Sequence, residues 1–331
     1  MANLFLTGGT GFFGKALLRY WKSTGSHFDK IFILSRNPKS FLKDHSDLIA
    51  ELNVEFIQGD ILEASKIVLK DDIEYVIHAA TDSTIGPSLG RLEVFNQIVK
   101  GTEEVLKFAV NHHCNRFLLT SSGAVYGPQL QGMEKIPESY LGSPYPLDPN
   151  SAYGLGKKAA EHLCALYKEQ HGLNYVIARC FAFVGEDLSM DAHFAVGNFI
   201  RDGLSAKGIN ILGDGTPLRS YMYQEDLAHW LITLLFKGKS GAAYNVGSDE
   251  IVSIADLAHL VRDLVAPDAH VRILYKADPM HARNRYVPDI SLARSELGLD
   301  VTIRIEDAIY NTALAHRNRS LKIAYRNANK K

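Results

Sequence analysis

A tyrosine and a lysine lie one helical turn apart in a segment with helical periodicity, residues 152–171. Tyr153 and Lys157 therefore share one face of the expected helix. A free phenol has a pKa near ~10 and is a poor acid or base at neutral pH, but a neighbouring cation favours the phenolate and lowers that pKa. We expect Lys157 to lower the pKa of Tyr153, so that Tyr153 can exchange a proton with a substrate oxygen.

A third polar group strengthens this hypothesis, because the tyrosine–lysine spacing alone often arises by chance on solvated helices. Ser122 closes the segment Thr120-Ser121-Ser122, which follows a buried strand pattern. The carboxyl ends of parallel strands face the ligand crevice of an open sheet. A serine hydroxyl at that edge can bind the same substrate oxygen as Tyr153.

The chain opens with a glycine-rich turn between a strand pattern and a helix pattern, residues 7–14. We expect Gly8 to permit the tight turn, Gly11 to let the backbone approach a pyrophosphate, and Gly14 to let the helix pack on the strand. That helix, residues 12–21, would point its positive end at the phosphates. The turn predicts dinucleotide binding, with Lys157 donating to the ribose hydroxyls. Its candidate contacts are Gly8, Thr10, Gly11, Phe12, Phe13 and Gly14.

The end of the second strand bears on the choice of cofactor. An acidic residue about 20 positions beyond the turn usually binds the ribose hydroxyls of NAD, but this chain has Ser35 followed by Arg36. Ser35 carries no charge that would repel a 2′-phosphate, and Arg36 can pair with one unless it is only a solvated charge. We therefore favour NADP(H), with NAD(H) as the alternative.

Asp60, beside Ile61, follows the third expected strand. Its carboxylate could accept a hydrogen bond from the adenine amino group, and it could equally cap the next helix. One side chain can fill both roles.

Short apolar runs alternate with longer amphipathic stretches along the N-terminal half. This alternation predicts a doubly wound (Rossmann) α/β fold, a parallel sheet with helices on both faces and right-handed crossovers. The expected strands are residues 3–7, 30–35, 54–57, 75–79, 116–120 and 175–178, and the clearest helix is 92–113.

The pattern changes after about residue 185, where polar loops and shorter elements predict a smaller C-terminal substrate-binding lobe. We assign residues 1–180 with about 219–248 to the dinucleotide-binding domain, because an expected helix at 221–236 and strand at 243–246 could rejoin the main sheet. Residues 181–218 with 249–316 form the lobe. Residues 317–331 form a basic tail that we expect to fray.

Composition excludes several classes of partner. The 331 residues include 36 basic and 37 acidic side chains, so no global field would recruit nucleic acid or an anionic membrane. The three cysteines are far apart and predict neither a disulfide framework nor a metal site. The apolar stretches are too short to span a bilayer and no targeting segment precedes the first strand, so we expect a cytoplasmic protein.

Several ordered motifs together resemble the extended short-chain dehydrogenase/reductase family, in its nucleotide-sugar epimerase/dehydratase branch. The resemblance covers nearly the whole chain, through residues 7–14, 76–80, 120–127, 149–157, 213–216 and 244–248. It implies that the catalytic set is Ser122, Tyr153 and Lys157. It also implies that the cofactor or substrate cleft is lined by Ala79, Ala80 and Thr81.

The resemblance also implies a set of substrate contacts and an assembly. Ser122 and Tyr153 would contact the sugar, and Arg219 would hold the pyrophosphate unless it is a solvated loop charge. Arg283 is a second candidate, although Arg285 competes for that role. A homodimer through the helices 92–113 and 152–171 is the implied assembly.

Three departures from the family pattern bear on the reaction. Many 4,6-dehydratases have an acidic pair directly after the catalytic hydroxyl, where this chain has Gly123 and Ala124. Dehydration would therefore lack its usual acid and base. Ala182 stands where the family often has an asparagine on the substrate phosphate, and Asn198 is our candidate substitute. Ile98 replaces a further asparagine expected three residues before Gly101.

These features favour an NAD(P)-dependent oxidoreductase that acts on a nucleotide sugar. The specific hypothesis is reduction of a nucleotide-linked 4-keto-6-deoxy sugar, in which Tyr153 protonates the alkoxide and Ser122 hydrogen-bonds it. A 4-epimerase with tightly bound NAD would use the same residues and stays open. A non-catalytic dinucleotide-sensing regulator is the alternative of another class, but such a chain would be expected to lose part of the catalytic set.

Overall fold

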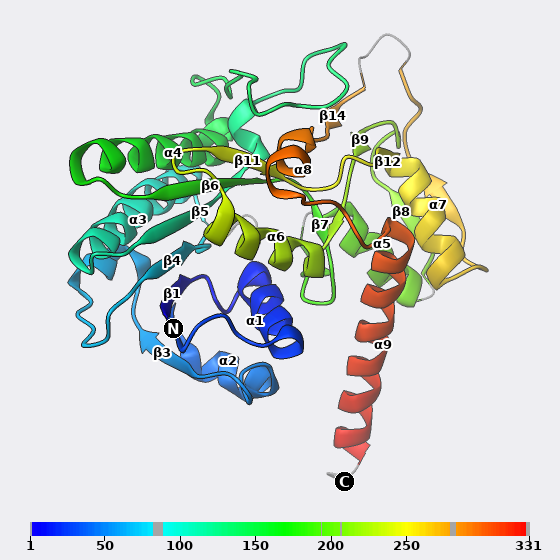
Figure 1. Cartoon of the computed structure of the whole chain (residues 1–331). Helices are drawn as coiled ribbons and strands as arrows, with labels where there is room; N and C mark the ends of the chain where they lie inside the picture. The colour runs from blue at the N-terminus through cyan, green and yellow to red at the C-terminus, as the bar shows by residue number, and fades with distance from the viewer. Residues whose placement is uncertain (1, 82–88, 193, 206, 279–282, 329–331) are drawn as a thin grey trace.

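The computed structural model describes residues 2–81, 89–192, 194–205, 207–278 and 283–328. Within these, seven strands form one parallel sheet in the order β11-β6-β5-β4-β1-β2-β3 (Figure 1). The doubly wound α/β fold is thereby confirmed, and the expected strand at 243–246 joins the sheet beside β6. The strands are β1 (Asn3–Thr7), β2 (Lys30–Ser35), β3 (Val54–Gln58), β4 (Tyr75–His78), β5 (Arg116–Ser122), β6 (Tyr175–Cys180) and β11 (Ala243–Val246).

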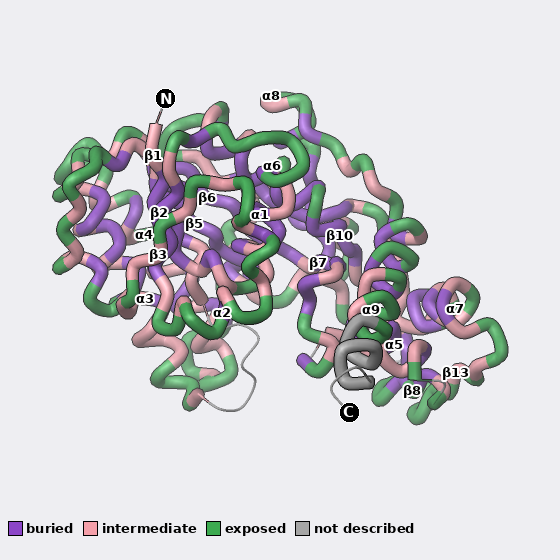
Figure 2. Tube along the Cα trace, turned by 90° about the horizontal axis from the view of Figure 1, so that it is seen from below, coloured by how far each residue is buried: buried purple, intermediate pink, exposed green. Residues whose placement is uncertain are grey.

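The apolar cores on the two faces of the sheet follow the strand period, because alternate residues of a strand point to opposite faces. Leu4 and Leu6 of β1 pack in the core that α1 and α6 cover, whereas Phe5 packs in the core that α3 and α4 cover. Figure 2 shows buried strands in the middle of this half and exposed helix surface around them. The helices are α1 (Phe12–Thr24), α2 (Pro38–His45), α3 (Arg91–Asn111), α4 (Ala152–His171) and α6 (Gln224–Lys237).

A second lobe of short strands and helices packs around its own apolar core. β7 pairs with β10, β8 pairs with β13, and β9 lies between β12 and β14. No helix in the described ranges is long and apolar enough to cross a membrane. The elements of this lobe are β7 (Phe183–Val184), α5 (Ala195–Leu204), β8 (Ile209–Ile211), β9 (Leu218–Arg219), β10 (Met222–Tyr223), β12 (Val252–Ser253), α7 (Ile254–Val265), β13 (Val271–Ile273), β14 (Arg285–Tyr286) and α9 (Ile305–Ala328). α8 (Ser291–Leu297) packs instead against β11 and α6, in the core of the main sheet.

The C-terminal segment, for which we predicted a frayed basic tail, is helical through residue 328; residues 329–331 lie outside the described part. Its cations have partners that the sequence did not reveal. Arg317 donates to the carbonyl of Val265 over 2.6 Å, and Arg319 donates to the carbonyl of Glu186 over 2.7 Å. These contacts hold α9 against the second lobe, and in Figure 1 it runs from there to the C-terminus.

Three cations surround the carboxylate of Asp187, two of them from α1 and one from α9. Arg19 of α1 donates to it over 2.5 Å, while Lys15 and Arg319 approach its carboxylate to 3.6 and 3.2 Å. Burial alone would raise the pKa of Asp187, but the hydrogen bond and charge of Arg19, helped by Lys15 and Arg319, lower it below its usual value. This ionic cluster ties the first helix of the chain to the last.

Asp187→Asn should lower the free energy of unfolding at neutral pH by about 3 kcal/mol, because it leaves three cations around a buried neutral group. The pKa of Asp187 is lower in the folded than in the unfolded chain, so its contribution is present above the unfolded pKa near ~4 and is lost as the pH falls further. Urea denaturation at several pH values measures both effects. The matched control, Asp263→Asn, removes an exposed ion pair and should cost less than about 1 kcal/mol. Equal losses in the two variants would show that the cluster is not stabilising.

Candidate active site

A cavity of about 1100 Å³ runs along the carboxyl edge of the sheet, where the second lobe faces it. The predicted site residues that line it include most of the glycine-rich turn, the end of β2, the end of β4 and the expected catalytic set. These residues are Gly8, Thr10, Gly11, Phe12, Phe13, Ser35, Arg36, Asp60, Ile61, Ala79, Ala80, Thr81, Ser122, Tyr153, Lys157 and Arg219. The topology thus brings together side chains that are far apart in the sequence.

The glycine-rich turn is shaped as a phosphate cradle. Gly8 has a φ of 74°, and a Cβ added there would lie 2.4 Å from the carbonyl oxygen of Ala79. A Cβ on Gly14 would lie 2.2 Å from Gly9, so Gly14 serves helix packing and does not itself line the cavity. At Gly11 an added Cβ would meet only the Gly8 carbonyl oxygen at 3.4 Å, which leaves this backbone open to a ligand. Helix α1 begins directly after it, and its positive end suits a pyrophosphate.

The end of the cavity beside β2 and β3 is suited to a nucleoside. Ser35 and Arg36 line it and no carboxylate follows β2 directly. Asp60 caps the short helix that follows β3, since its Oδ1 accepts from the backbone N–H of Leu62 over 2.9 Å. Its capping role is therefore observed, and its carboxylate still borders the cavity. Asp44 and His45 of α2 also line this end, and no local motif in the sequence identified them.

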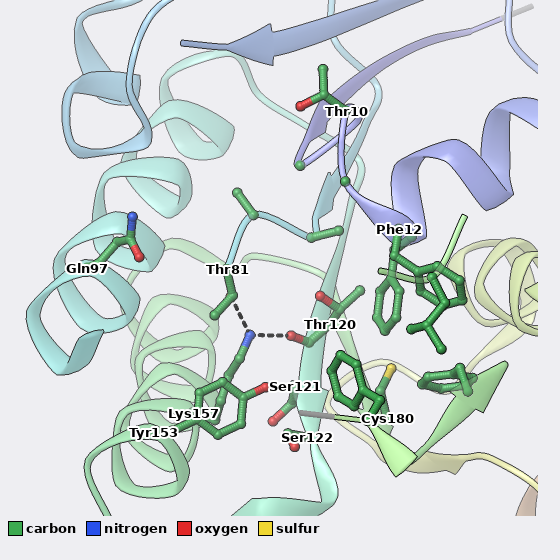
Figure 3. A pocket seen from close by; sticks show the side chains of 18 of the residues that line it. Thr10, Phe12, Thr81, Gln97, Thr120, Ser121, Ser122, Tyr153, Lys157 and Cys180 are labelled. Carbon is green, nitrogen blue, oxygen red and sulfur yellow. Dashed lines mark hydrogen bonds between the residues drawn. The ribbon is translucent and has the colours of Figure 1, made fainter. Parts of the chain in front are cut away.

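The expected catalytic set meets at the other end of the cavity (Figure 3). Ser122 ends β5, two residues later than the strand pattern predicted, and Tyr153 and Lys157 lie on the first turns of α4. The Lys157 ammonium is only 4% exposed; it donates to Thr81 Oγ1 over 2.7 Å and to the Thr120 carbonyl over 2.8 Å. A buried ammonium needs such acceptors, and they fix its position beside the tyrosine.

The pKa values in this cluster correct one expectation. Burial raises the pKa of Tyr153 to about 12, although a hydrogen bond with Ser122 opposes the rise. Burial also lowers the pKa of Lys157 to about 8. In the protein without cofactor the pKa of Tyr153 is therefore shifted in the direction opposite to the prediction, because burial of the phenol dominates and Lys157 is not among the groups that shift it. Tyr153 is a protonated phenol at neutral pH.

A buried polar network holds the catalytic helix against the strands. Glu161, one turn beyond Lys157, accepts from Ser121 Oγ over 2.6 Å and from Arg179 Nη2 over 2.8 Å. Arg179 in turn donates to the hydroxyl of Tyr126 over 2.9 Å, which itself donates to Asn245 Oδ1 over 2.8 Å. Helix α4 is thereby connected to β5, β6 and β11. This network lies behind the catalytic residues and keeps their backbone in place.

The wall opposite the sheet comes from the second lobe and is strongly aromatic. Arg219 lines it, half-buried, and donates to the carbonyl of Leu218 over 2.8 Å; burial lowers its pKa. A guanidinium in this position suits a phosphate. The sequence analysis missed the aromatic lining, because the side chains come from separate short strands and loops and share no local motif. They are Phe181, Phe183, Phe194, Tyr221 and Tyr286.

Two predicted substrate contacts are not part of the cavity lining. The Oδ1 of Asn198 accepts a hydrogen bond over 3.3 Å from Arg201, which lies on the same helix, α5. Arg283 is exposed, and its charge acts on Asp214 instead. Arg285, the competing candidate, donates to the carbonyl of Glu134 over 3.2 Å. The structure therefore gives no support to Asn198 or Arg283 as substrate ligands, because both side chains lie outside the cavity.

A further departure has a structural explanation. Ile98 is buried, and its side chain lies 3.3 Å from where a Cβ on Gly156 of α4 would be. An apolar residue at 98 thus packs the two outer helices together.

In the part of the chain that the structure describes, no group of His, Cys, Asp and Glu could hold a metal ion, and all three cysteines are free thiols.

A parallel dinucleotide-binding sheet with a serine, a tyrosine and a lysine at its carboxyl edge defines the extended short-chain dehydrogenase/reductase class. Residues 4–247 match the family described as "NAD dependent epimerase/dehydratase family", and the chain belongs to this family. It is an NAD(P)-dependent enzyme of the short-chain dehydrogenase/reductase type, and the alternative of a non-catalytic regulator is set aside.

The similar proteins named below are enzymes of UDP-linked sugars. The chain is 27% identical over 314 residues to UDP-glucuronic acid decarboxylase 1 of Danio rerio, covering 94% of this chain and 71% of the relative. It is 29% identical to UDP-glucuronic acid decarboxylase 6 of Arabidopsis thaliana, covering 93% and 86%. Among solved structures, UDP-glucuronic acid 4-epimerase from Bacillus cereus in complex with NAD superposes with a TM-score of 0.79 at 25% identity, covering 96% and 99%. UDP-glucose 4-epimerase from Thermotoga maritima shares the fold with a TM-score of 0.82 at 20% identity, with the same coverage.

Proposed function

We propose that this enzyme reduces the ketone of a nucleotide-linked 4-keto-6-deoxy sugar. The observation that carries the proposal is the composition of the catalytic end of the cavity. Among the described lining residues the carboxylates are Asp44 and Asp60, both at the nucleoside end, so the catalytic end offers hydroxyls and one ammonium. Such a site can move a proton onto an oxygen, but it lacks the paired carboxylates that removal of water would use.

The protonation state of Tyr153 supports the reductive direction. Its pKa of about 12 keeps the phenol protonated at neutral pH, which is the state that a donor to a developing alkoxide needs. A bound nicotinamide cofactor supplies the hydride. Tyr153 then gives its proton to the sugar oxygen, and Ser122 hydrogen-bonds the same oxygen. Lys157, held by Thr81 and Thr120, keeps one N–H that would donate to the ribose of a bound cofactor.

A 4-epimerase is the second candidate, and the similarity to a UDP-glucuronic acid 4-epimerase holding NAD favours it. It would use the same three side chains and return the hydride to the opposite face of the sugar. The named relatives also make a UDP-linked uronic acid a substrate to test. We further propose a homodimer through α3 and α4, which lie side by side on the outer face.

A screen of nucleotide sugars separates these candidates. The purified protein should oxidise added NADPH only when a nucleotide-linked 4-keto sugar is present, and product analysis should show a new carbinol. Turnover of UDP-glucose or UDP-glucuronic acid with no added cofactor, together with NAD released on denaturation, would instead identify an epimerase or a decarboxylase. An absence of any reaction would contradict the proposed function.

Tyr153→Phe should lower kcat at least ~100-fold, since it removes the proton donor while preserving the ring. Cofactor binding, measured by fluorescence titration, should stay within about twofold of the wild type, because the hydroxyl contributes to chemistry more than to binding. The control is Tyr310→Phe on the exposed face of α9. If cofactor binding and kcat fell together, Tyr153 would be a structural residue.

We also propose that the enzyme prefers NADP(H), because Ser35 and Arg36 border the nucleoside end of the cavity. Arg36→Glu should lower kcat/KM for NADPH by roughly 10- to 100-fold, which corresponds to the loss of one charged hydrogen bond. The value for NADH should change little. Lys39→Glu reverses an exposed charge on α2 that does not line the cavity, and it provides the matched control. An unchanged ratio of the two coenzymes would refute the role of Arg36.

A further inference from the structure

A buried imidazole connects two strands of the main sheet with the helix that covers them. His78 ends β4 and is 3% exposed. Its Nδ1 lies 2.7 Å from the hydroxyl oxygen of Thr7, the last residue of β1, and its Nε2 lies 3.1 Å from the hydroxyl oxygen of Thr102 on α3. Burial, helped by the charge of Lys157, lowers the pKa of His78 to about 3, so the imidazole is neutral at neutral pH. A neutral imidazole donates from one nitrogen and accepts at the other.

The two distances indicate the direction of each hydrogen bond. A hydroxyl donor typically lies about 2.7 Å from its acceptor, and an N–H donor lies about 2.9–3.0 Å away. The short contact of Nδ1 therefore fits a proton donated by Thr7, and the longer contact of Nε2 fits a proton donated to Thr102. Thr7 also needs Nδ1 as its acceptor, because its other side-chain partner among the described residues is the backbone N–H of Ala80, which can only donate.

The hydroxyl oxygen of Thr7 holds the segment that follows β4. It accepts from the Ala80 N–H over 3.2 Å, and the Ala79 N–H donates to the Thr7 carbonyl over 3.2 Å. The phosphate turn is packed against the same segment, since a Cβ on Gly8 would lie 2.7 Å from the Ala80 nitrogen. The Thr7 side chain therefore joins the turn to this segment, and His78 sets the direction of its hydroxyl.

Both acceptors of Lys157 are attached to the same part of the fold (Figure 3). Thr81 follows Ala80 directly and accepts from Lys157 through its hydroxyl. Thr120 accepts from Lys157 through its carbonyl, and its own hydroxyl donates to the His78 carbonyl over 3.1 Å. The groups that replace water around the ammonium are thus held from the side of His78.

We propose that His78 is a positioning residue, which directs the Thr7 oxygen and thereby holds an acceptor against Lys157. That acceptor is the hydroxyl of Thr81. The inference rests on the proposed role of Lys157 at the reacting centre. His78 does not line the cavity, so it acts through the groups that it positions and not on the substrate itself.

The protonation of Lys157 reports whether this arrangement is intact. Burial favours the neutral amine and lowers the pKa of Lys157 to about 8, so the loss of an acceptor should lower that pKa further. The titratable groups that favour the charged ammonium are Cys180 of β6 and Glu161 of α4. Tyr153 precedes it on α4 and is a neutral phenol at neutral pH, as is the imidazole of His78 on β4 a neutral group.

His78→Phe should lower the pH at which the reductive reaction fails. The rate falls as the pH rises through the pKa of Lys157, because the ammonium supplies a charge and the third N–H that the ribose would accept. With Thr81 no longer held, the midpoint should move down by roughly 1 pH unit, and kcat above both midpoints should fall about tenfold. A purely structural defect would lower the rate at every pH and leave the midpoint in place.

Thr7 offers a matched pair of variants. Thr7→Val removes the hydroxyl while preserving the branched shape and should reproduce the shift, whereas Thr7→Ser keeps the hydroxyl and should keep the wild-type midpoint. Combining His78→Phe with Thr7→Val should shift the midpoint no further than either change alone, because both break the same hydrogen bond. An unchanged midpoint in His78→Phe and Thr7→Val would overturn the proposal, as would equal shifts in Thr7→Val and Thr7→Ser.

Thr312→Val is the control away from the site. Thr312 is a buried threonine of α9, and its hydroxyl donates to the Ala308 carbonyl over 2.7 Å. Its loss removes a buried hydrogen bond of the second lobe and should leave the midpoint unchanged. A shift in this variant as large as that in Thr7→Val would also overturn the proposal.

A second measurement needs no turnover. The isotope-labelled Cε resonance of Lys157, assigned by its disappearance in Lys157→Met, reports the protonation of the amine. Its titration midpoint should move down in His78→Phe and Thr7→Val and stay in place in Thr7→Ser and Thr312→Val. If no nucleotide sugar reacts with the wild type, the proposed function has failed, and this titration still decides whether His78 acts on Lys157. A midpoint that stays in place in both His78→Phe and Thr7→Val overturns the inference.

Discussion

The burial of one ammonium group constrains the whole catalytic end of the cavity. Lys157 lies almost out of solvent, and a charge in that position is tolerated only where acceptors replace water. The carbonyl of Thr120 and the hydroxyl of Thr81 supply them, so the end of β5 and the segment after β4 must meet at this one point. Tyr153 precedes Lys157 on the same face of α4 and is placed by the same contact.

Close packing of α4 against its neighbours makes that contact possible. A Cβ on Gly154 would lie 2.7 Å from the carbonyl oxygen of Ala124, and Gly156 packs against Ile98 of α3. One turn further, Glu161 and Arg179 form a buried ion pair with additional hydrogen bonds to Ser121 and Tyr126. Removing one partner of such a pair would leave an uncompensated buried charge, so helix and strands are locked together.

Local patterns in the sequence were sufficient for the sheet, the phosphate turn and the grouping of Ser122, Tyr153 and Lys157. The sheet and the turn depend on periodicity and on spacing within a few residues, whereas Ser122 was grouped with Tyr153 and Lys157 because it ends a parallel strand and matches the family motif. The pKa of Tyr153 could not be predicted in this way, because it depends on how much solvent the second lobe excludes. Tyr286 was missed for a related reason: its position in the cavity depends on the space beside Gly123 and on the pairing of β14 with β9. Arg283 was proposed from family position and Asn198 as a substitute for the asparagine missing at Ala182, and neither residue lines the cavity.

The ionic cluster at Asp187 links the start of the chain to its end. Arg19 belongs to the helix that begins at the phosphate turn, and Arg319 belongs to α9, the last helix of the described residues. Movement of α9 away from the second lobe would withdraw Arg319 and leave Asp187 with Arg19 and Lys15 of α1. A disturbance at α9 would therefore reach the helix that follows the phosphate turn through a single carboxylate.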